Sequence, residues 1–315
     1  MRIIILGAGV QGTLFGVRLA RAGHDVTFIA RGMRAEELRR LGAVIEGALD
    51  LRTDTLQLPV AERLEPDVRA DLCLVAVRRE QIASVLPTLS AATSIARIVL
   101  MVNHANGSEE LFKALGRKRV VLAFPGAAGS IEAGVDRYVE VSEQATVVEA
   151  KALDMISLFK GAGFRVAPVK DMDAWLRRHA VFVTAFAGAI YEAGGDARSL
   201  GANRERVRDL ILAVREGWSV LDRRGVEPAP LPLRMIFCWI PLAFSTTYWQ
   251  RLLSSTRGEL YFARHARHAP TEMAALATDV RELLDGEPMP HLARLFAAID
   301  RAKAGTQVER HFGSI

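Results

Sequence analysis

Three glycines near the N-terminus have the types and spacing of a phosphate-binding loop. Gly7, Gly9 and Gly12 form the pattern G-x-G-x-x-G directly after an apolar run at residues 3–6. In dinucleotide-binding units the first glycine permits a tight turn, the second lets the backbone approach a pyrophosphate, and the third lets the helix pack against the strand. The phosphates then lie at a helix N-terminus, whose free N–H groups attract anions. We expect cofactor contacts from Gly7, Ala8, Gly9, Val10, Gln11 and Gly12.

The pattern alone is weak evidence, because a purely structural glycine turn would also satisfy it. A helix-patterned segment follows the glycines, and a second apolar strand, residues 26–30, comes next. At its end an NAD site usually has Asp or Glu, but this chain has Arg31, with Arg34 close behind. Because a guanidinium can bind a 2′-phosphate through two parallel hydrogen bonds, we predict NADP as the cofactor. The alternative is that Arg31 is a solvated charge at a strand end.

The composition is that of a globular enzyme with two domains. The chain has 315 residues, of which 50% are hydrophobic and 24% charged. Its net charge of +5 arises from 41 basic and 36 acidic residues that are interspersed, so a nucleic-acid partner is not indicated. Cys73 and Cys238 lie in apolar segments, where we expect inert packing and no disulfide.

The secondary structure that the sequence predicts around the glycine loop changes in pattern near residue 168. Before it, short β-rich runs alternate with amphipathic helices, which predicts a doubly wound α/β sheet over residues 1–168. After it, helix-period segments predict an all-α domain over residues 169–315, a substrate and dimerisation domain. Strands are expected at 2–6, 26–30, 71–77, 97–102, 120–124, 138–141, 145–148 and 164–167, and the long helices at 173–193, 203–224, 271–284 and 290–304.

Neither a targeting segment nor a membrane span is predicted. The chain begins directly on its first core strand, and the apolar runs at 180–191 and 235–244 are too short to cross a bilayer. Both runs are expected to be buried helices. We therefore expect a cytoplasmic protein with no membrane partner, and from the apolar helical half we expect a homodimer.

Taken in order, these motifs resemble the ketopantoate reductase family. The resemblance rests on the Gly-Ala-Gly loop, Ala30-Arg31-Gly32, the segment Val75 to Arg78, an Asn-containing loop after the next strand, and a helical half opened by Trp175. It spans nearly the whole chain. It implies reduction of 2-dehydropantoate, a branched 2-keto acid of pantothenate biosynthesis, with NADPH as the hydride donor.

The resemblance also implies site residues in the first half. Arg78 occupies a position that is commonly Lys in the family and keeps its positive charge, although it could be a solvated surface residue. Asn103 matches the family's loop near the nicotinamide and substrate, and Asn106 is a second candidate. An amide offers both a donor and an acceptor to a ligand. For Asn106, a turn or helix cap before Glu109 is an equal alternative.

The sequence departs from the family at the helix that carries Trp175. The family's proton-donating Lys position is Arg177 here, and its two asparagine positions are Val181 and Ala185. An arginine stays charged and is a poor proton donor, but it can stabilise a developing alkoxide or orient a carboxylate. The proton for the keto oxygen must then come from another group. The alternative is that Arg177 and Arg178 are surface charges on this helix. The apolar residues at 181 and 185 predict a substrate that is bulkier or less hydroxylated than ketopantoate.

Candidates for that proton donor are few. His179 lies about 200° around the helix from Arg177 and cannot share its face, which leaves Lys170 as a possible acid. The resemblance implies that Glu272 is a catalytic residue near the substrate hydroxyl or the cofactor ribose. The family's serine pair matches Ser254 and Ser255 as substrate ligands, but the gap to Glu272 is several residues longer than usual. Glu272 also fits ordinary helix-start chemistry. No metal site is expected, because no carboxylate or cysteine cluster accompanies His265 and His268.

Two functions are consistent with these residues. The first is an NADPH-dependent reductase of a 2-keto acid, in which Arg177 replaces the usual lysine. The second is a non-catalytic NADP-binding or redox-sensing protein on the same fold, because the Lys and Asn positions have changed.

Overall fold

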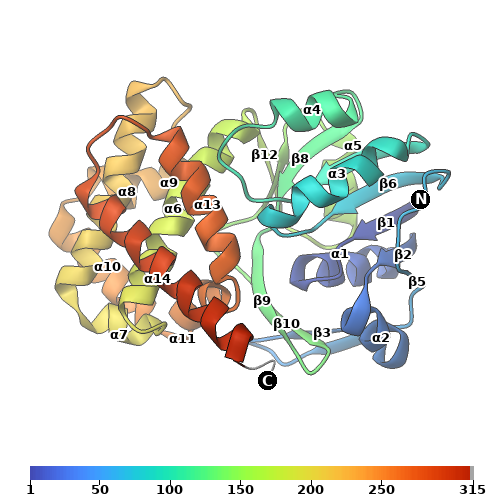
Figure 1. Ribbon diagram of the computed structural model, residues 1–315, viewed down its shortest axis with the longest axis horizontal. Helices are drawn as coiled ribbons and strands as arrows, with labels where there is room; N and C mark the ends of the chain where they lie inside the picture. The colour runs from blue at the N-terminus through green and yellow to red at the C-terminus, as the bar shows by residue number, and fades with distance from the viewer. Residues whose placement is uncertain (313–315) are drawn as a thin grey trace. The chain divides into compact units, whose positions relative to one another are not determined.

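The computed structural model describes residues 1–312, which form two compact units. The first comprises Met1–Asn103 and Ser108–Met172, and the second comprises His104–Gly107 and the chain from Asp173 onward. Figure 1 colours the strands of the first unit blue to green and the helices of the second yellow to red. The first unit carries the sheets and the second is helical, so the predicted fold class, an α/β N-terminal half followed by an all-α half, is confirmed.

The first unit is built on a mostly parallel eight-stranded sheet. Its order is β12-β11-β8-β7-β6-β1-β2-β5, with β1 paired in parallel to β2 on one side and β6 on the other. This reversal of strand order beside β1 is where open α/β sheets bind ligands. The strands are β1 (Arg2–Leu6), β2 (Asp25–Ile29), β5 (Val60–Ala61), β6 (Ala70–Val75), β7 (Ile95–Leu100), β8 (Val120–Phe124), β11 (Thr146–Glu149) and β12 (Val166–Val169).

A second, four-stranded sheet of order β4-β3-β10-β9 was not expected from the sequence. Its strands are β3 (Ala43–Gly47), β4 (Thr53–Leu56), β9 (Ala127–Glu132) and β10 (Val135–Glu140). The run at 138–141, expected in the main sheet, belongs to β10 and pairs with β3 and β9 instead. Strands β4 and β9 are only half buried, so their sequences lack the continuous apolar runs that mark a doubly covered strand.

Helices α1 and α5 pack together in the first unit through edge-to-face rings of Phe15 and Phe159, whose centroids lie 5.3 Å apart. Helix α1 also contacts β3, β9 and β10 of the small sheet. The glycine loop is therefore positioned by the buried strand β1 that precedes it and by helix α1 that follows it, which packs against α5 and the small sheet. The helices are α1 (Val10–Arg21), α2 (Gly32–Leu41), the 3₁₀ turn η1 (Arg79–Gln81), α3 (Ile82–Ala91), α4 (Glu109–Leu115) and α5 (Leu153–Gly161).

The second unit packs around the long helix α6, whose apolar residues are largely buried. Its helices are α6 (Met172–Glu192), α7 (Ala197–Ala202), α8 (Arg204–Arg223), α9 (Leu231–Arg234), the π-helical η2 (Met235–Trp239), α10 (Leu242–Leu253), α11 (Thr256–Gly258), the π-helical η3 (Glu259–Ala263), α12 (Arg264–His268), α13 (Pro270–Leu283) and α14 (Pro290–Phe312).

One expected buried helix, residues 235–244, is exposed along much of its length. Trp239 is 57% exposed and Phe244 70% exposed, and Cys238 is exposed as well, so the expectation of inert packing at Cys238 is wrong. Pro241 ends the π-helical turn and starts a new helix, which prevents one continuous face from turning inward. Cys73 is fully buried in β6, as expected, and burial raises its pKa to about 12. Across residues 1–312, no helix has both the length and the apolar character of a membrane span.

Candidate functional site

The glycine loop has the geometry that its spacing predicts. Gly7 has φ +101°, a left-handed conformation that favours glycine. A Cβ built on Gly12 would lie 1.9 Å from the Gly7 carbonyl oxygen, so helix α1 can approach the turn only with glycine there. Gly9 differs, because its φ of −73° is ordinary and a Cβ would meet no atom within 4 Å. The fold of the described residues thus explains Gly7 and Gly12 but does not require glycine at position 9.

The N-terminus of α1 is open to an anion. Gly9 is its N-cap, no side chain caps it, and its first turn carries no acidic residue. The first N–H groups of a helix have no partner within the helix, so those of the α1 turn are available to a ligand. Beside them, Gln11 donates from Nε2 to the Ala127 carbonyl oxygen at 2.7 Å, while its Oε1 is buried without a hydrogen bond.

Two arginines follow the strands that flank β1. Arg31 follows β2 as the N-cap of α2 and is exposed, and it makes no hydrogen bond or ion pair with the described part of the chain. Arg78 follows β6 and is also exposed, while its backbone N–H donates to Gln81 Oε1. Arg34, in contrast, is held by neighbouring residues and is not available to a ligand phosphate.

Asn103 lies three residues beyond β7, on the same sheet edge, and is 8% exposed. Its Oδ1 is buried with no hydrogen-bond donor in the described structure. A buried amide oxygen without a donor is costly, so a polar ligand would relieve it. The open Gly9, the α1 N-terminus, Arg31 and Asn103 together fit a nicotinamide dinucleotide.

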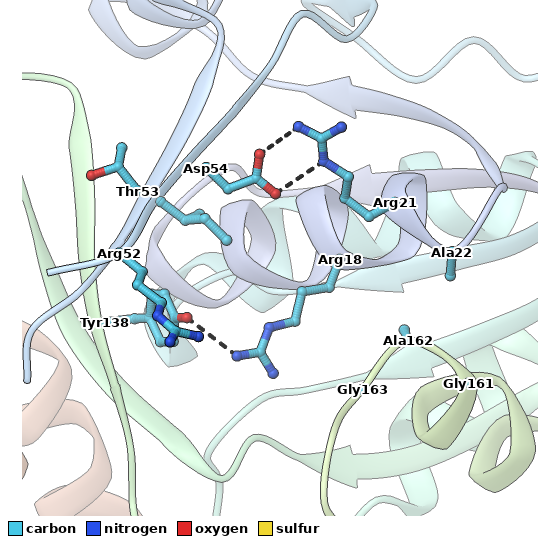
Figure 2. A pocket seen from close by; sticks show the side chains of 11 residues that line it. Arg18, Arg21, Ala22, Arg52, Thr53, Asp54, Tyr138, Gly161, Ala162 and Gly163 are labelled. Atoms are coloured by element: carbon cyan, nitrogen blue, oxygen red, sulfur yellow. Dashed lines mark hydrogen bonds and ion pairs between the residues drawn. The ribbon is translucent and has the colours of Figure 1, made fainter. Parts of the chain in front are cut away.

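A cavity of about 430 Å³ in the first unit lies at the other end of α1 (Figure 2). Its arginines are already paired: Arg18 donates to Glu140 at 2.9 Å, and Arg21 donates twice to Asp54. Helix C-termini, which disfavour anions, also border it at Ala22 and Gly161. This cavity is therefore not the dinucleotide site.

In the second unit, Arg177 of α6 lies against the segment His104–Gly107. A Cβ built on Gly107 would lie 3.1 Å from Arg177 Nη2, and Arg177 Nε is buried without a hydrogen bond. On the same segment, Asn106 donates from Nδ2 to Asp279 Oδ1 at 3.3 Å and to Glu282 Oε2 at 3.1 Å. The second unit thus brings the catalytic candidate Arg177 next to the loop of the substrate-binding candidate Asn106.

Sequence reasoning missed the two carboxylates that hold Asn106. A signal was available for one of them, because Asp279 follows Glu272 by seven residues on α13 and so lies on the same helix face. Glu272 itself is half buried. Burial raises the pKa of the Tyr191 phenol, and the charge of Glu272 adds to that rise. The pairing of Asn106 with Asp279 and Glu282 could not be seen in the sequence, since it joins positions more than 170 residues apart.

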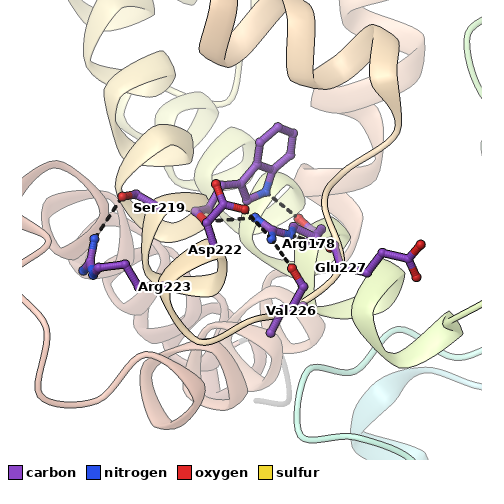
Figure 3. A network of polar contacts seen from close by, with 7 residues as sticks. Arg178, Ser219, Asp222, Arg223, Val226 and Glu227 are labelled. Carbon is purple, nitrogen blue, oxygen red and sulfur yellow. Dashed lines mark hydrogen bonds and ion pairs between the residues drawn. The ribbon is translucent and has the colours of Figure 1, made fainter.

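Arg178 is not a surface charge, contrary to one expectation, but a buried structural residue (Figure 3). Its guanidinium donates to the carbonyl oxygens of Trp218, Val226 and Glu227 and to Asp222 Oδ1, the last at 2.6 Å. Trp218 Nε1 donates in return to the Arg178 carbonyl oxygen at 3.0 Å. Adjacent arginines on one helix therefore have different surroundings: Arg178 joins α6 to α8 through its hydrogen bonds, and the buried Nε of Arg177 has none among the described residues.

His179 and Lys170 are the two residues that the sequence raised as possible acids, and the structure separates them. The His179 ring stacks on Trp175 with centroids 4.7 Å apart, and burial, with a smaller contribution from His265, lowers the pKa of His179 to about 3. It is therefore neutral at physiological pH and has no imidazolium proton to give. Lys170 is exposed in the connection between β12 and α6 and belongs to the first unit.

The side chains at the two expected asparagine positions are in the helical core. Val181 and Ala185 are both fully buried. A Cβ built on Gly217 of α8 would lie 2.5 Å from Val181 Cγ1, which shows that α6 and α8 are in tight contact at this point. Because neither side chain lines an open space, the expectation of a bulkier substrate loses its structural basis.

The serine pair lies at the end of α10. Ser255 Oγ donates to the Leu252 carbonyl oxygen at 2.6 Å, and a Cβ built on Gly201 of α7 would lie 2.5 Å from Ser254 Oγ. The long gap before Glu272 is helical and contains the π-helical turn η3, so the extra residues are accommodated within helix. Among the described residues, no cluster of three or more His, Cys, Asp or Glu could hold a metal ion.

Known proteins place the chain by both sequence and fold. The family model described as "Ketopantoate reductase PanE/ApbA" matches residues 3–143. The 2-dehydropantoate 2-reductase of Pyrococcus abyssi is 32% identical over 248 residues, which cover 75% of this chain and 79% of that protein. The enzyme of the same name from Pyrococcus horikoshii is 34% identical over 122 residues, which cover 38% of either chain.

Solved structures agree in fold. The PanE/ApbA family ketopantoate reductase of Ralstonia eutropha has a TM-score of 0.74 at 21% identity, covering 98% of this chain and all of that one. A D-mandelate dehydrogenase solved with NADH and anilino(oxo)acetate has a TM-score of 0.70 at 14% identity, covering 97% and 99%. With the glycine loop, the sheet order and the helical half in place, the chain belongs to the ketopantoate reductase family.

Proposed function

We propose that this protein is an NADP-dependent oxidoreductase that reduces a 2-keto acid of the ketopantoate type. The observation that carries the proposal is Gly9, a glycine that neither the backbone conformation nor the packing of the described residues requires. A ligand that needs the volume of a missing Cβ explains it, and in this loop geometry that ligand is a pyrophosphate. The names of the relatives, 2-dehydropantoate 2-reductase, supply the substrate class.

The cofactor is held by residues of the first unit. The N–H groups of the α1 turn bind the pyrophosphate, and the unpaired Arg31 binds the 2′-phosphate that distinguishes NADP from NAD. Arg78, after the neighbouring strand, adds positive charge. Asn103 donates to and accepts from the nicotinamide carboxamide or the substrate. When bound, the reduced cofactor supplies the hydride that adds to the keto carbon.

Arg177 stabilises the negative charge that grows on the keto oxygen as the hydride arrives. Its guanidinium has a buried Nε without a hydrogen bond, so it can donate to a keto acid without losing an existing contact. Because an arginine remains protonated, it supplies charge and hydrogen bonds and does not supply the proton. The candidate for the proton donor is Lys170, and Glu272 is the candidate catalytic residue near the substrate hydroxyl or the cofactor ribose. Asn106, Ser254 and Ser255 are the candidates for holding the substrate.

The test is NADPH oxidation, followed by absorbance, with ketopantoate and a panel of branched 2-keto acids. We expect turnover with at least one panel member and tighter binding of NADPH than of NADH. Tight NADPH binding with no turnover across the whole panel would favour the second function, a non-catalytic NADP-binding or redox-sensing protein. The observation in favour of that function is the arginine at position 177, which cannot act as the usual acid.

We also propose a homodimer formed through the second unit. Four large apolar side chains within fourteen residues of this unit are exposed: Leu231, Met235, Trp239 and Phe244. An apolar surface of this kind is typical of an interface core in soluble proteins. Light scattering of the purified protein is expected to give twice the chain mass of 34.5 kDa, and Trp239→Glu is expected to give the monomer mass.

A further inference from the structure

We propose that Arg34 is a positioning residue that sets the orientation of the dinucleotide loop and does not contact the 2′-phosphate. This inference rests on the proposed cofactor, because it assigns a role toward that ligand. In sequence, Arg34 stands three residues after Arg31 and is an equally attractive phosphate ligand. The contacts of the Arg34 side chain distinguish its role from that of Arg31.

The Arg34 guanidinium joins four different parts of the first unit. Nε donates to the Ala8 carbonyl oxygen at 2.8 Å, and Nη2 donates to Thr13 Oγ1 at 3.0 Å. Nη1 donates to Glu37 Oε2 at 3.1 Å and to the Gly134 carbonyl oxygen at 3.2 Å. Each of its three nitrogens is thus engaged, and the side chain is only 17% exposed. Arg34 cannot turn to a ligand without breaking this set of contacts.

The Ala8 carbonyl is the important acceptor, because it belongs to the peptide that precedes Gly9. It accepts a second hydrogen bond from Thr13 Oγ1 at 3.2 Å, and Thr13 is fully buried. In a planar trans peptide the N–H points opposite to the carbonyl. Two donors on the Ala8 oxygen therefore direct the Gly9 N–H away from Arg34.

The other side of Gly9 is fixed by backbone. Its carbonyl oxygen accepts from the Thr13 N–H at 2.8 Å, the bond that starts α1. Both peptides of Gly9 are thus anchored before any ligand arrives. Burial raises the pKa of the Asp136 carboxyl on β10 well above its ordinary value, and the charge of Arg34 opposes this rise without a hydrogen bond. Arg34 links α2 and the small sheet to the loop, and so pre-organises the loop for the part of the cofactor common to NADP and NAD.

The proposal is tested by dissociation constants for both NADPH and NADH, measured by calorimetry on wild type and on matched variants. Arg34→Met is expected to weaken both cofactors about tenfold or more and to leave their ratio within about twofold. Arg31→Ala is expected to weaken NADPH alone, because it removes only the 2′-phosphate contact. Arg39→Met, at an exposed arginine of the same helix that pairs with Glu62, is expected to change neither constant.

A second pair of variants tests the Ala8 contact if Arg34→Met does not fold. Thr13→Val keeps the shape but removes the hydroxyl, and is expected to weaken both cofactors equally. Thr13→Ser keeps the hydroxyl and is expected to bind both like wild type. A loss confined to NADPH in Arg34→Met, or unchanged constants in Arg34→Met or Thr13→Val, would overturn the positioning role while leaving the cofactor proposal intact. Wild type that binds neither NADPH nor NADH would overturn both.

Discussion

Gly9→Ala separates what the fold needs from what the ligand needs. At φ −73° and ψ −168° an alanine is unstrained, and its Cβ meets no atom within 4 Å. We expect an unfolding free energy that is unchanged or higher by about 0.4–1 kcal/mol, since alanine restricts the unfolded chain. Gly12→Ala places a Cβ 1.9 Å from the Gly7 carbonyl oxygen, and we expect it to lose about 1–3 kcal/mol or more through overpacking.

Although Gly9→Ala should not lower the free energy of unfolding, it should weaken the binding of NADPH. Its added methyl group enters the space that we assign to the pyrophosphate, so we expect the Kd for NADPH to rise at least about tenfold, which is about 1.4 kcal/mol. Gly161→Ala is the matched control, because a Cβ there also meets nothing within 4 Å but lies away from the loop. Denaturant unfolding and calorimetry measure both effects. A Gly9→Ala protein that binds NADPH like wild type, or that loses stability, would refute the reasoning.

Three further predictions concern α6. Arg177→Met should lower kcat/KM for a 2-keto acid by about 10²–10³-fold, because it removes charge stabilisation. Arg177→Lys should raise ketopantoate turnover above that of wild type, because it restores a group that can give a proton. Steady-state kinetics check both predictions, and equal rates in all three proteins would contradict them. Arg178→Met should lower the unfolding free energy by on the order of 3 kcal/mol in denaturant titrations, because carbonyls lose their donor, while exposed Arg223→Met should change it by less than about 0.5 kcal/mol. His179 has its pKa lowered to about 3, so between that pH and about 6.5 only the unfolded chain gains the proton, and stability falls as pH falls. His179→Phe should therefore reduce the pH dependence of the denaturant midpoint between about pH 7 and pH 5, and an unchanged pH dependence would count against a neutral His179 in the folded protein.

Local sequence patterns predicted much of the first unit. The apolar run before Gly7, the helix after Gly12 and the strand ending at Ile29 are consecutive segments, and each carries its own periodicity. Strands β4 and β9 of the small sheet were missed because they are half buried and carry no continuous apolar run. The exposed 235–244 run shows the converse, since hydrophobic content does not by itself determine which residues are buried.

Two pairs of arginines that are close in sequence illustrate the limit of sequence reasoning at the site. Arg31 and Arg34, and likewise Arg177 and Arg178, are chemically identical and differ only in what surrounds them. The acceptors around Arg34 include Gly134, one hundred residues away, and those around Arg178 include Trp218, forty residues away. No local pattern specifies such partners, because they are brought together by the packing of separate elements.

The sequence by itself determined the cofactor loop and the family, because a glycine spacing and a strand-helix-strand order are local properties of consecutive residues. The tertiary structure decided which of these polar groups have hydrogen-bond partners among the described residues. It placed Arg34 and Arg178 among protein acceptors, put Val181 and Ala185 into the core, and left Arg31, Asn103 Oδ1 and Arg177 Nε without partners among the described residues. The physical reason is that a hydrogen bond needs both its donor and its acceptor in place, and folding brings together residues that the sequence keeps far apart.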